Sequence, residues 1–342
     1  MVKGVMKVAC LLSLIPILFG SCKKENTAVT PPSPPSPGYQ MFDSKPTWSP
    51  DGSRIIFFRA VYNPTTRLYV PDSQGLWMVN ADGSNPHLLL RDGETSDWSP
   101  DGKCVAYTPC DRYVDSTWAP TEEIYKIPVE ESSVRVSEKQ FLAVGRYPAW
   151  SPNGEWLTYV GVDHFHLDYP RWDSILVMRN DGTGKRLVAR CPSAFAYPDW
   201  SPDGNFLIFC TTEELNNTGI YENYIAKVNL SDTSQIIKIR VRNEYAGIDE
   251  ALVRPHYSPD GTKIIFTRER VKGPRPMEEI FIMNADGSDV HKIANGEDAY
   301  WSPDGRKIVF AQEKNTQEGY LQGTYLWIMN IDGTNLRQLT FP

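Results

Sequence analysis

The sequence predicts an all-β fold, because one short motif recurs along most of its length. The motif Trp-Ser-Pro-Asp-Gly occurs six times with two changes, Asn153 for Asp and Tyr257 for Trp. Its copies lie 44 to 57 residues apart, at 48–52, 98–102, 150–154, 200–204, 257–261 and 301–305. Repeats of this length, each with four strand-like segments, are typical of propeller blades. We therefore predict a six-bladed β-propeller of four-stranded antiparallel blades over residues 42–342.

Each repeat has the same order of elements. The first strand ends at the aromatic residue of the motif, and a Pro-Asp-Gly turn leads to a second, apolar strand such as residues 55–58. Proline presets φ in such a turn, aspartate bonds its own backbone, and glycine takes a positive φ. After a loop, the third strand runs into an Asp-Gly turn, as in residues 76–83, and the fourth strand follows at 88–90. The third-strand signature recurs at 175–182, 280–287 and 326–333, and in weaker form at 124–129 and 224–230.

The start of the chain is predicted to be an export signal, residues 1–21. Lys3 and Lys7 precede an apolar run of about a dozen residues, which is shorter than the roughly 20 that span a bilayer. The small residues directly before Cys22 resemble the lipobox of bacterial lipoproteins, which implies a lipid on Cys22. Cleavage with release is the alternative. Residues 22–41 are polar and then proline-rich, so we expect an extended tether.

Charge and cysteine content limit the partners and the chemistry. Removing residues 1–21 takes away Lys3 and Lys7 but no acidic residue, which lowers the net charge from -7 to -9. An acidic surface repels phosphate backbones, so nucleic acid is not expected as a partner. In an oxidising compartment four cysteines allow three pairings, and spacing does not choose between a bridge and free thiols. These four are Cys104, Cys110, Cys191 and Cys210.

The six motifs resemble the PD40, or WD40-like, repeats of the TolB-like propeller family. The resemblance covers about the last 300 residues. It implies a propeller that holds a protein segment at the outer membrane. Only the tether precedes the first repeat, so we do not expect the small α/β domain that TolB carries ahead of its propeller. The sixth repeat supplies its own last strand at 336–341, so closure is not expected to need an N-terminal strand.

The order of strands separates two sides of the disc. The Pro-Asp-Gly and Asp-Gly turns lie on one side, here called the turn face, and they are too alike to be a specific site. The loops between second and third strands lie on the other side, here called the loop face, and no two agree in length or sequence. Variable loops on a rigid scaffold usually carry recognition, and Tyr, Trp and Arg anchor interfaces. Candidate partner-binding residues on the loop face are Tyr69, Tyr113, Trp118, His164, His166, Trp172, Arg268 and Arg270.

A second group of candidates precedes the motifs, where the first strands would surround a central funnel. It consists of Glu94, Arg146, Tyr147, Tyr197, Arg254, His256 and Asp298. The pair His164 and His166, flanked by Asp163 and Asp168, is the best metal candidate, but it needs a third ligand from elsewhere. We therefore predict no metal and no cofactor.

These features favour a non-catalytic binding protein of the cell envelope, an outer-membrane lipoprotein that binds a protein or peptide over the funnel. The alternative is a propeller enzyme acting on a polysaccharide with the help of a metal, or a glycan-binding protein whose Trp rings stack on sugars. A peptidase is not expected, because no serine has glycine two residues before and two residues after it.

Overall fold

The computed structural model describes residues 38–70, 73–110, 112–114, 117–119, 123–131, 133–162, 172–191, 196–214, 221–239, 241, 250–270, 277–315 and 321–342. The predicted signal, Cys22 and most of the tether lie outside these ranges. Within them every regular element is a strand except η1 (Val136–Glu138), a single 3-10 turn. The described residues contain no helix with the length and apolar character needed to cross a membrane.

The strands follow the predicted order in every repeat. The first strands are β1 (Gln40–Trp48), β6 (Gly93–Trp98), β13 (Arg146–Trp150), β17 (Asp199–Trp200), β21 (Glu250–Tyr257) and β25 (Glu297–Trp301). The second strands are β2 (Arg54–Asn63), β7 (Cys104–Pro109), β14 (Trp156–Val162), β18 (Phe206–Glu214), β22 (Lys263–Arg270) and β26 (Lys307–Asn315). Each first strand ends at the motif's aromatic residue, as predicted.

The outer strands complete the repeats. The third strands are β4 (Gly75–Asn80), β10 (Glu123–Glu130), β15 (Trp172–Arg179), β19 (Tyr221–Asn229), β23 (Met277–Asn284) and β27 (Leu321–Asn330). The fourth strands are β5 (His87–Arg91), β12 (Gln140–Val144), β16 (Arg186–Arg190), β20 (Asp232–Ile239), β24 (His291–Asn295) and β28 (Arg337–Gln338). Four short strands lie outside this scheme: β3 (Leu68–Tyr69), β8 (Arg112–Val114), β9 (Thr117–Ala119) and β11 (Ser133–Val134).

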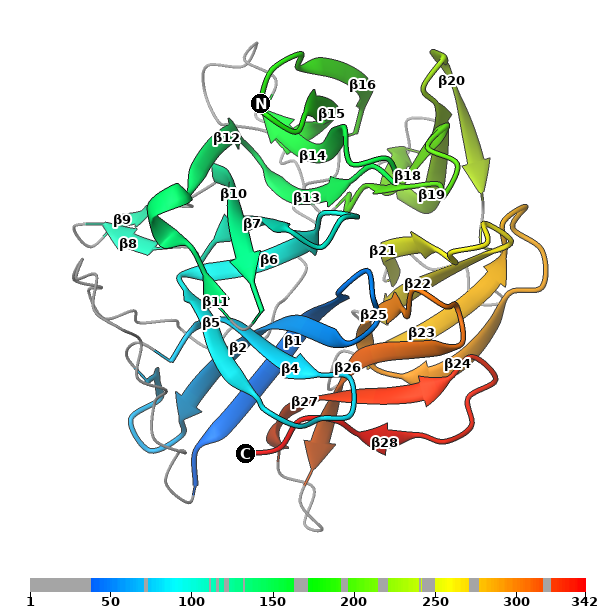
Figure 1. Cartoon of the computed structure of the whole chain (residues 1–342). Coiled ribbons are helices and arrows are strands. Elements are labelled where there is room, and N and C mark those ends of the chain that lie inside the picture. Colours follow the sequence, from blue (N-terminus) through cyan, green and yellow to red (C-terminus); the bar gives the residue numbers. More distant parts are fainter. Residues whose placement is uncertain are drawn as a thin grey trace, which may run out of the picture.

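The sheets are arranged around a common centre (Figure 1). In the described part of the chain, β13 to β16, β17 to β20 and β21 to β24 form separate four-stranded sheets, and β6, β7, β10 and β12 form a fourth meander to which β11 is added. The remaining long strands belong to one nine-stranded sheet, in which β1 joins β2 to β27. The first strands contact one another in a closed ring, from β1 through β6, β13, β17, β21 and β25 back to β1. The fold is therefore an all-β, propeller-like arrangement of four-stranded antiparallel sheets.

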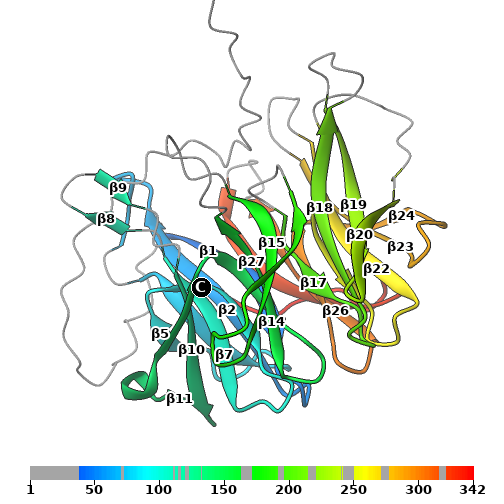
Figure 2. The ribbon, with the colours of Figure 1, turned by 90° about the horizontal axis from the view of Figure 1, so that it is seen from above.

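The two faces of the disc differ as predicted. Figure 2 shows the β8–β9 hairpin, which lies between a second and a third strand, on the opposite side of the molecule from β11, which follows a third strand. Loop face and turn face are thus separated by the length of the strands.

The repeated motif forms a hydrogen-bonded turn. In the first repeat Ser49 Oγ donates to Asp51 Oδ1 at 2.6 Å, and the Arg54 N–H donates to Ser49 Oγ at 2.9 Å. These bonds hold the pKa of Asp51 down at about 2, with the Ser49 hydroxyl as the largest cause. Asn153 takes the same place in the third repeat and accepts from Ser151 Oγ at 2.7 Å. The motif is therefore a folding element, as its repetition implied.

The four cysteines that the structure describes, Cys104, Cys110, Cys191 and Cys210, are free thiols. Leu207 and Phe209 of β18 pack in the same core cluster as Cys191, whereas Cys210 packs in the next cluster. Side chains alternate between the two faces of a strand, so the thiols of Cys191 and Cys210 lie on opposite faces of this sheet. Cys191 Sγ instead donates to the Cys210 carbonyl oxygen at 3.5 Å. This placement disfavours a bridge between them.

The nine-stranded sheet contains a seam between the two ends of the repeat array. The start of β1 pairs in parallel with β27, with Met41 opposite Gly323. Gly323 has a φ of 148°, and a Cβ there would lie 2.3 Å from the Met41 carbonyl oxygen, so only glycine fits. The last repeat does supply its own fourth strand, β28, but the N-terminal strand also joins the sheet, which the sequence did not predict.

A buried ion pair between β1 and β2 lies beside this seam, and a hydrogen bond from the last repeat reaches it across the seam. Arg59 Nε and Nη2 donate to the two carboxylate oxygens of Asp43, both at 2.6 Å, and the Thr340 hydroxyl donates to Asp43 at 2.5 Å. Asp43 is fully buried, and the Arg59 guanidinium lies over the rings of Phe57 and Trp77, 5.2 and 5.0 Å from their centroids. Removal of one partner leaves a buried charge without its counterion.

Asp43→Asn is therefore expected to lower the free energy of unfolding by about 3–5 kcal/mol. The matched control is Asp51→Asn, which reproduces the residue that Asn153 already supplies in an equivalent turn. Urea unfolding followed by tryptophan fluorescence measures both variants. If the two variants lose the same free energy of unfolding, the Asp43 ion pair does not stabilise the seam more than an ordinary turn residue stabilises its turn.

Candidate functional site

Five of the six repeats share an unusual backbone feature three residues before the motif's aromatic residue. Five residues at this position have left-handed φ angles of 44° to 55° although none is glycine: Lys45, Tyr147, Tyr197, Arg254 and Asp298. The pairing register with the second strand is interrupted at this point in β1, β13, β21 and β25. Such φ angles cost energy and persist where the surrounding structure fixes them, often at functional sites.

The charged members of this set meet at the centre of the ring. The Lys45 backbone N–H donates to Asp298 Oδ2 at 2.8 Å, and the Lys45 ammonium pairs with Glu94. Arg254 pairs with Asp298 and, at 3.2 Å, with Glu297 Oε2. These residues come from four different first strands, so the contacts can form only where those strands converge. We call Lys45, Glu94, Tyr147, Tyr197, Arg254, Glu297 and Asp298 the central cluster.

The aromatic members stack beside the charged ones. The ring centroids of Tyr147 and Tyr197 are 4.2 Å apart, and the Arg254 guanidinium lies 4.7 Å from the centroid of Tyr197. Arg254 Nη2 also donates to the Tyr197 hydroxyl at 3.3 Å. Burial raises the pKa of Tyr197 well above its usual value, so the hydroxyl stays protonated. The stack therefore presents rings and a guanidinium side by side.

Carboxylates crowd one side of the central cluster. Burial, together with the nearby charge of Asp298, raises the pKa of Glu297 to about 7. Burial and the charges of Glu297 and Glu269 raise the pKa of Glu278, on β23, to about 9. Near neutral pH Glu278 is therefore protonated and Glu297 is partly protonated, whereas exposed carboxyl groups would be ionised.

A second tier of polar residues lies one residue before the motif's aromatic residue, toward the turn face. Asp97 Oδ2 accepts from the Trp150 backbone N–H at 2.7 Å, and the Tyr300 hydroxyl donates to Asp97 Oδ1 at 3.3 Å. His256 Nδ1 lies 3.1 Å from Asp199 Oδ2, and its ring centroid is 4.6 Å from that of Tyr300. Burial raises the pKa of Asp97 to about 7.

Most of the predicted funnel residues do converge. Tyr147, Tyr197, Arg254 and Asp298 belong to the central cluster, His256 to the second tier, and Arg146 acts electrostatically on Glu94. Glu94 was also predicted near the funnel. The sequence interpretation missed five other residues of the two tiers: Lys45, Glu297, Asp97, Asp199 and Tyr300. A signal was present: each stands one, three or four residues before a motif's aromatic residue.

The predicted loop-face residues are more scattered. Arg268 and Arg270 lie on β22 and not in a loop, and both guanidinium groups are 2.9 Å from Glu279 Oε2 on the neighbouring strand. Arg268 is buried and stacks on Phe281 at 4.5 Å. The strand extends past its apolar core because these cross-strand ion pairs stabilise it. Their assignment to a loop was wrong.

The remaining loop-face candidates fall in or near short strands. Tyr69 packs edge-on against Tyr62, with ring centroids 5.5 Å apart, within its own repeat. Tyr113 and Trp118 are cross-strand partners in the β8–β9 hairpin, and Trp172 opens β15. His164 and His166 lie outside the described residues. Among the residues that are described, no group of three or more His, Cys, Asp or Glu side chains is placed to hold a metal ion.

The fold and the site define a class of protein: a propeller-like protein in which a Ser-Pro-Asp-Gly turn joins the first and second strands, and charged and aromatic groups from the first strands and the residues just before them meet at one centre. Residues 129–341 match the model of the TolB beta propeller domain, PD40. The chain belongs to this family. A comparison with curated proteins found no match.

Solved structures share the fold at low sequence identity. The putative TolB from Agrobacterium tumefaciens is 19% identical, over 86% of this chain and 97% of that one, with a TM-score of 0.52. TolB from Acinetobacter baumannii is 16% identical, over 86% and 78% of the two chains, with a TM-score of 0.56. An oligogalacturonate lyase in complex with manganese is 12% identical, over 86% and 91%, with a TM-score of 0.48. At these identities the likeness concerns the fold alone.

The raised pKa of Asp97 makes stability depend on pH. Between about pH 4, where an exposed aspartate ionises, and about pH 7, the folded protein holds a proton that the unfolded chain has released. The contribution of Asp97 to stability should therefore fall as pH rises through this window, by about 4 kcal/mol. Asp97→Asn should remove the part of this fall that Asp97 causes, while the parts caused by the raised pKa values of Glu297 and Glu278 remain.

Urea midpoints of the wild type and Asp97→Asn between pH 4.5 and 8 test the assignment. Asp51→Asn is the control, because the pKa of Asp51 is lowered and its linkage lies below pH 4. If the urea midpoints of wild type and Asp97→Asn change with pH in the same way, Asp97 is not a buried, protonated carboxyl group.

Proposed function

We propose that this chain is a non-catalytic binding protein of the bacterial cell envelope, built on a six-bladed propeller, that holds a protein segment or peptide over the centre of its loop face. The observation behind this proposal is the central cluster. Five left-handed, non-glycine residues at one position of the first strands supply Tyr, Arg, Lys and Asp side chains to one place.

The proposed number of six blades is supported by the six motif copies and by the closed ring of first strands. Six motif copies precede six second strands, and the ring of first strands closes with β25 against β1. The parallel pairing of Met41 and Gly323 joins two meanders within the nine-stranded sheet. If that pairing is counted as a seam, the first and sixth blades are β1, β2, β4, β5 and β25 to β28.

A peptide suits the central cluster better than a small apolar ligand. Each first strand begins at the loop face, so the position three residues before the aromatic lies nearer that face than the second tier. Tyr and Arg are enriched among the residues that contribute most of the binding energy of protein interfaces. Their strained backbone holds the side chains in place before a partner arrives, which reduces the entropy that binding costs.

Capture experiments with the full chain test this proposal. Tyr147→Ala and Arg254→Ala should each weaken retention of the envelope partner at least tenfold. Lys307→Ala is the matched control, because this exposed residue begins β26 at the turn face. Circular dichroism and melting establish that each variant is folded. If folded variants and the control retain the same partner equally well, the binding face has been misplaced.

We propose further that a lipid on Cys22 anchors the protein to the outer membrane. The support is the sequence of the leader, and the protein would face either the periplasm or the cell surface. Cys22→Ala, or growth with globomycin, should move the protein from the membrane to the soluble fraction, as seen by fractionation and immunoblotting. Unchanged fractionation would contradict the anchor.

One feature favours the alternative of an enzyme acting on a polysaccharide. The contact between His256 and Asp199 is an arrangement that can serve proton transfer. Turnover of polygalacturonate by the purified protein, with or without a divalent metal and lost in His256→Ala, would overturn the non-catalytic proposal.

A further inference from the structure

The interface between the fifth and sixth repeats gathers carboxyl groups from both. Glu278 on β23 lies directly opposite Glu269 on β22, a pairing of like charges that destabilises a sheet. Ile280 and Ile282 of β23 pack in one core cluster with Trp301 of β25. Alternate residues of a strand share a face, so the Glu278 side chain also lies on the side of the sheet that faces the sixth repeat.

The start of β25 completes this group. The Gly296 N–H donates to the Glu278 backbone carbonyl oxygen at 2.9 Å, and Glu297 and Asp298 follow as the first residues of β25. Both of these carboxylates pair with Arg254 of β21. The interface thus joins β23 to the start of β25 through one backbone hydrogen bond in the middle of several carboxyl groups.

Three cations of the fifth repeat lie on the other face of the same sheet. Glu279, the next residue of β23, accepts hydrogen bonds from Arg268 and Arg270 at 2.9 Å and from Lys292 at 2.7 Å. Burial acts to raise the pKa of Glu279, but these bonds lower it to about 2. The positive charge of these three side chains is therefore directed to Glu279 and away from the sixth repeat.

Glu278 has the opposite environment. Burial, followed by the charges of Glu297 and Glu269, raises its pKa to about 9, and the charge of Arg254 offsets only part of this effect. Asp298 acts in the same direction as the two glutamates. At neutral pH the Glu278 carboxyl group therefore stays protonated while the interface is closed.

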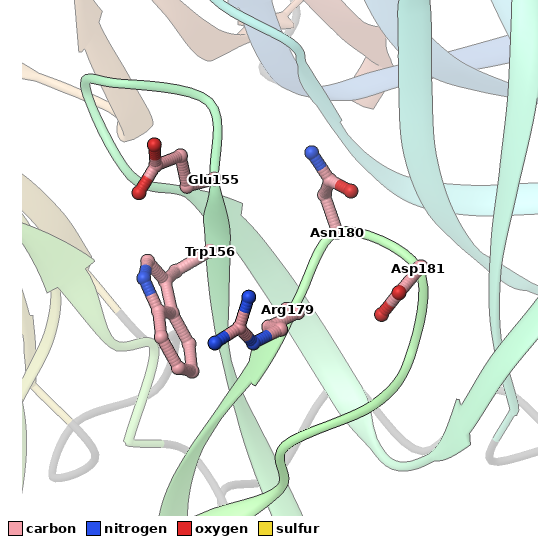
Figure 3. Close-up of a pocket in the computed structure, with 5 residues that line it drawn as sticks. All are labelled: Glu155, Trp156, Arg179, Asn180 and Asp181. Atoms are coloured by element: carbon pink, nitrogen blue, oxygen red, sulfur yellow. The ribbon is translucent and has the colours of Figure 1, made fainter.

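Carboxyl groups on the turn face can ionise where they are. Figure 3 shows Glu155 and Asp181 on either side of Arg179 at the turn face of the third repeat. Asp181 is exposed, and its pKa is lowered chiefly by the Thr183 hydroxyl and, to a smaller extent, by the charge of Arg179. Glu278 gains a comparable environment if β23 and the start of β25 separate, because water then reaches its carboxyl group.

We propose that the interface between the fifth and sixth repeats is a proton-dependent contact, which is closed while Glu278 is protonated and opens between β23 and the start of β25 as Glu278 ionises. Local openings of this kind need less free energy than unfolding of the whole chain. Asp298 also accepts from the Lys45 N–H and pairs with Arg254, so the opening reaches the central cluster. Its effect on a bound partner rests on the proposed function, whereas the opening itself does not.

The direction of the pH dependence follows from the raised pKa. The closed interface holds a proton that the opened one releases above the ordinary glutamate pKa of 4.5. The stability of the contact is therefore complete in acid and falls as pH rises toward about 9. Release of one proton makes opening about tenfold more favourable for each pH unit. Glu297, with a pKa of about 7, has given up most of its proton before the upper part of this range.

Hydrogen exchange of the Gly296 amide in the full chain tests the proposal, because this amide bonds to Glu278 across the interface. Its protection factor, which is corrected for the intrinsic exchange rate at each pH, should fall about tenfold per pH unit between about pH 7.5 and 8.5. Glu278→Gln keeps the size of the side chain but cannot ionise, so it should lose most of this dependence. Asp260→Asn is the matched control, because it removes a carboxylate of the same repeat whose pKa is lowered, and it should keep the wild-type dependence.

The Cys210 amide, bonded to the Ala196 carbonyl oxygen at 2.8 Å in the fourth repeat, is the internal reference. Near-ultraviolet circular dichroism establishes that each variant is folded. If Gly296 and Cys210 are equally protected at every pH, exchange requires unfolding of the whole chain and the proposal is wrong. The same pH dependence in wild type and folded Glu278→Gln would also overturn it. Exchange is measured without a partner, so either result stands whether or not the proposed function holds.

Discussion

The whole arrangement depends on one hydrogen-bonded turn. In each repeat a serine hydroxyl donates to the carboxylate or amide two residues on and accepts from the backbone at the start of the second strand. This fixes where the first strand stops and the second begins, and therefore the register between them. The register holds up to the residue before the aromatic; three residues before the aromatic, five repeats have a left-handed residue, and in several of them the register is interrupted there.

The seam joins the last repeat to the first, which the turns cannot do. Turns act within a repeat, whereas a ring must also join its last member to its first. Here the join combines the pairing of β1 with β27, a glycine that permits their approach, and the ion pair of Asp43 and Arg59 capped by Thr340. Burying an ion pair costs desolvation free energy. Its directional hydrogen bonds, however, favour one alignment of the strands, which an apolar contact would not specify.

Much of the fold could be predicted from the sequence because its rules are local. The ends of the first strands and the chemistry of the turns follow from the motif, and counting from the motif identified Tyr147, Tyr197, Arg254 and Asp298. Lys45, Asp97 and Glu297 stand at equivalent positions before their motifs but were missed, because their ion-pair and hydrogen-bond partners come from other repeats and cannot be known from the sequence. Arg268 and Arg270 were misplaced because charged residues resemble a loop until their partner across the strand, Glu279, is known. The pairing of Met41 with Gly323 joins residues too distant in sequence for any local pattern to indicate.

The position of β1 has a mechanical consequence. Any pull on the chain ahead of Gln40 is applied along β1, which is hydrogen-bonded to β2 on one side and, near its start, to β27 on the other. Force along a strand loads its hydrogen bonds together, in shear, whereas force across a hairpin opens them one at a time. Resistance to such a pull is set by the rate of unfolding. The strand that receives the load is also the one held by the buried charge of Asp43, so the seam that closes the ring is placed where a tethered protein would be strained.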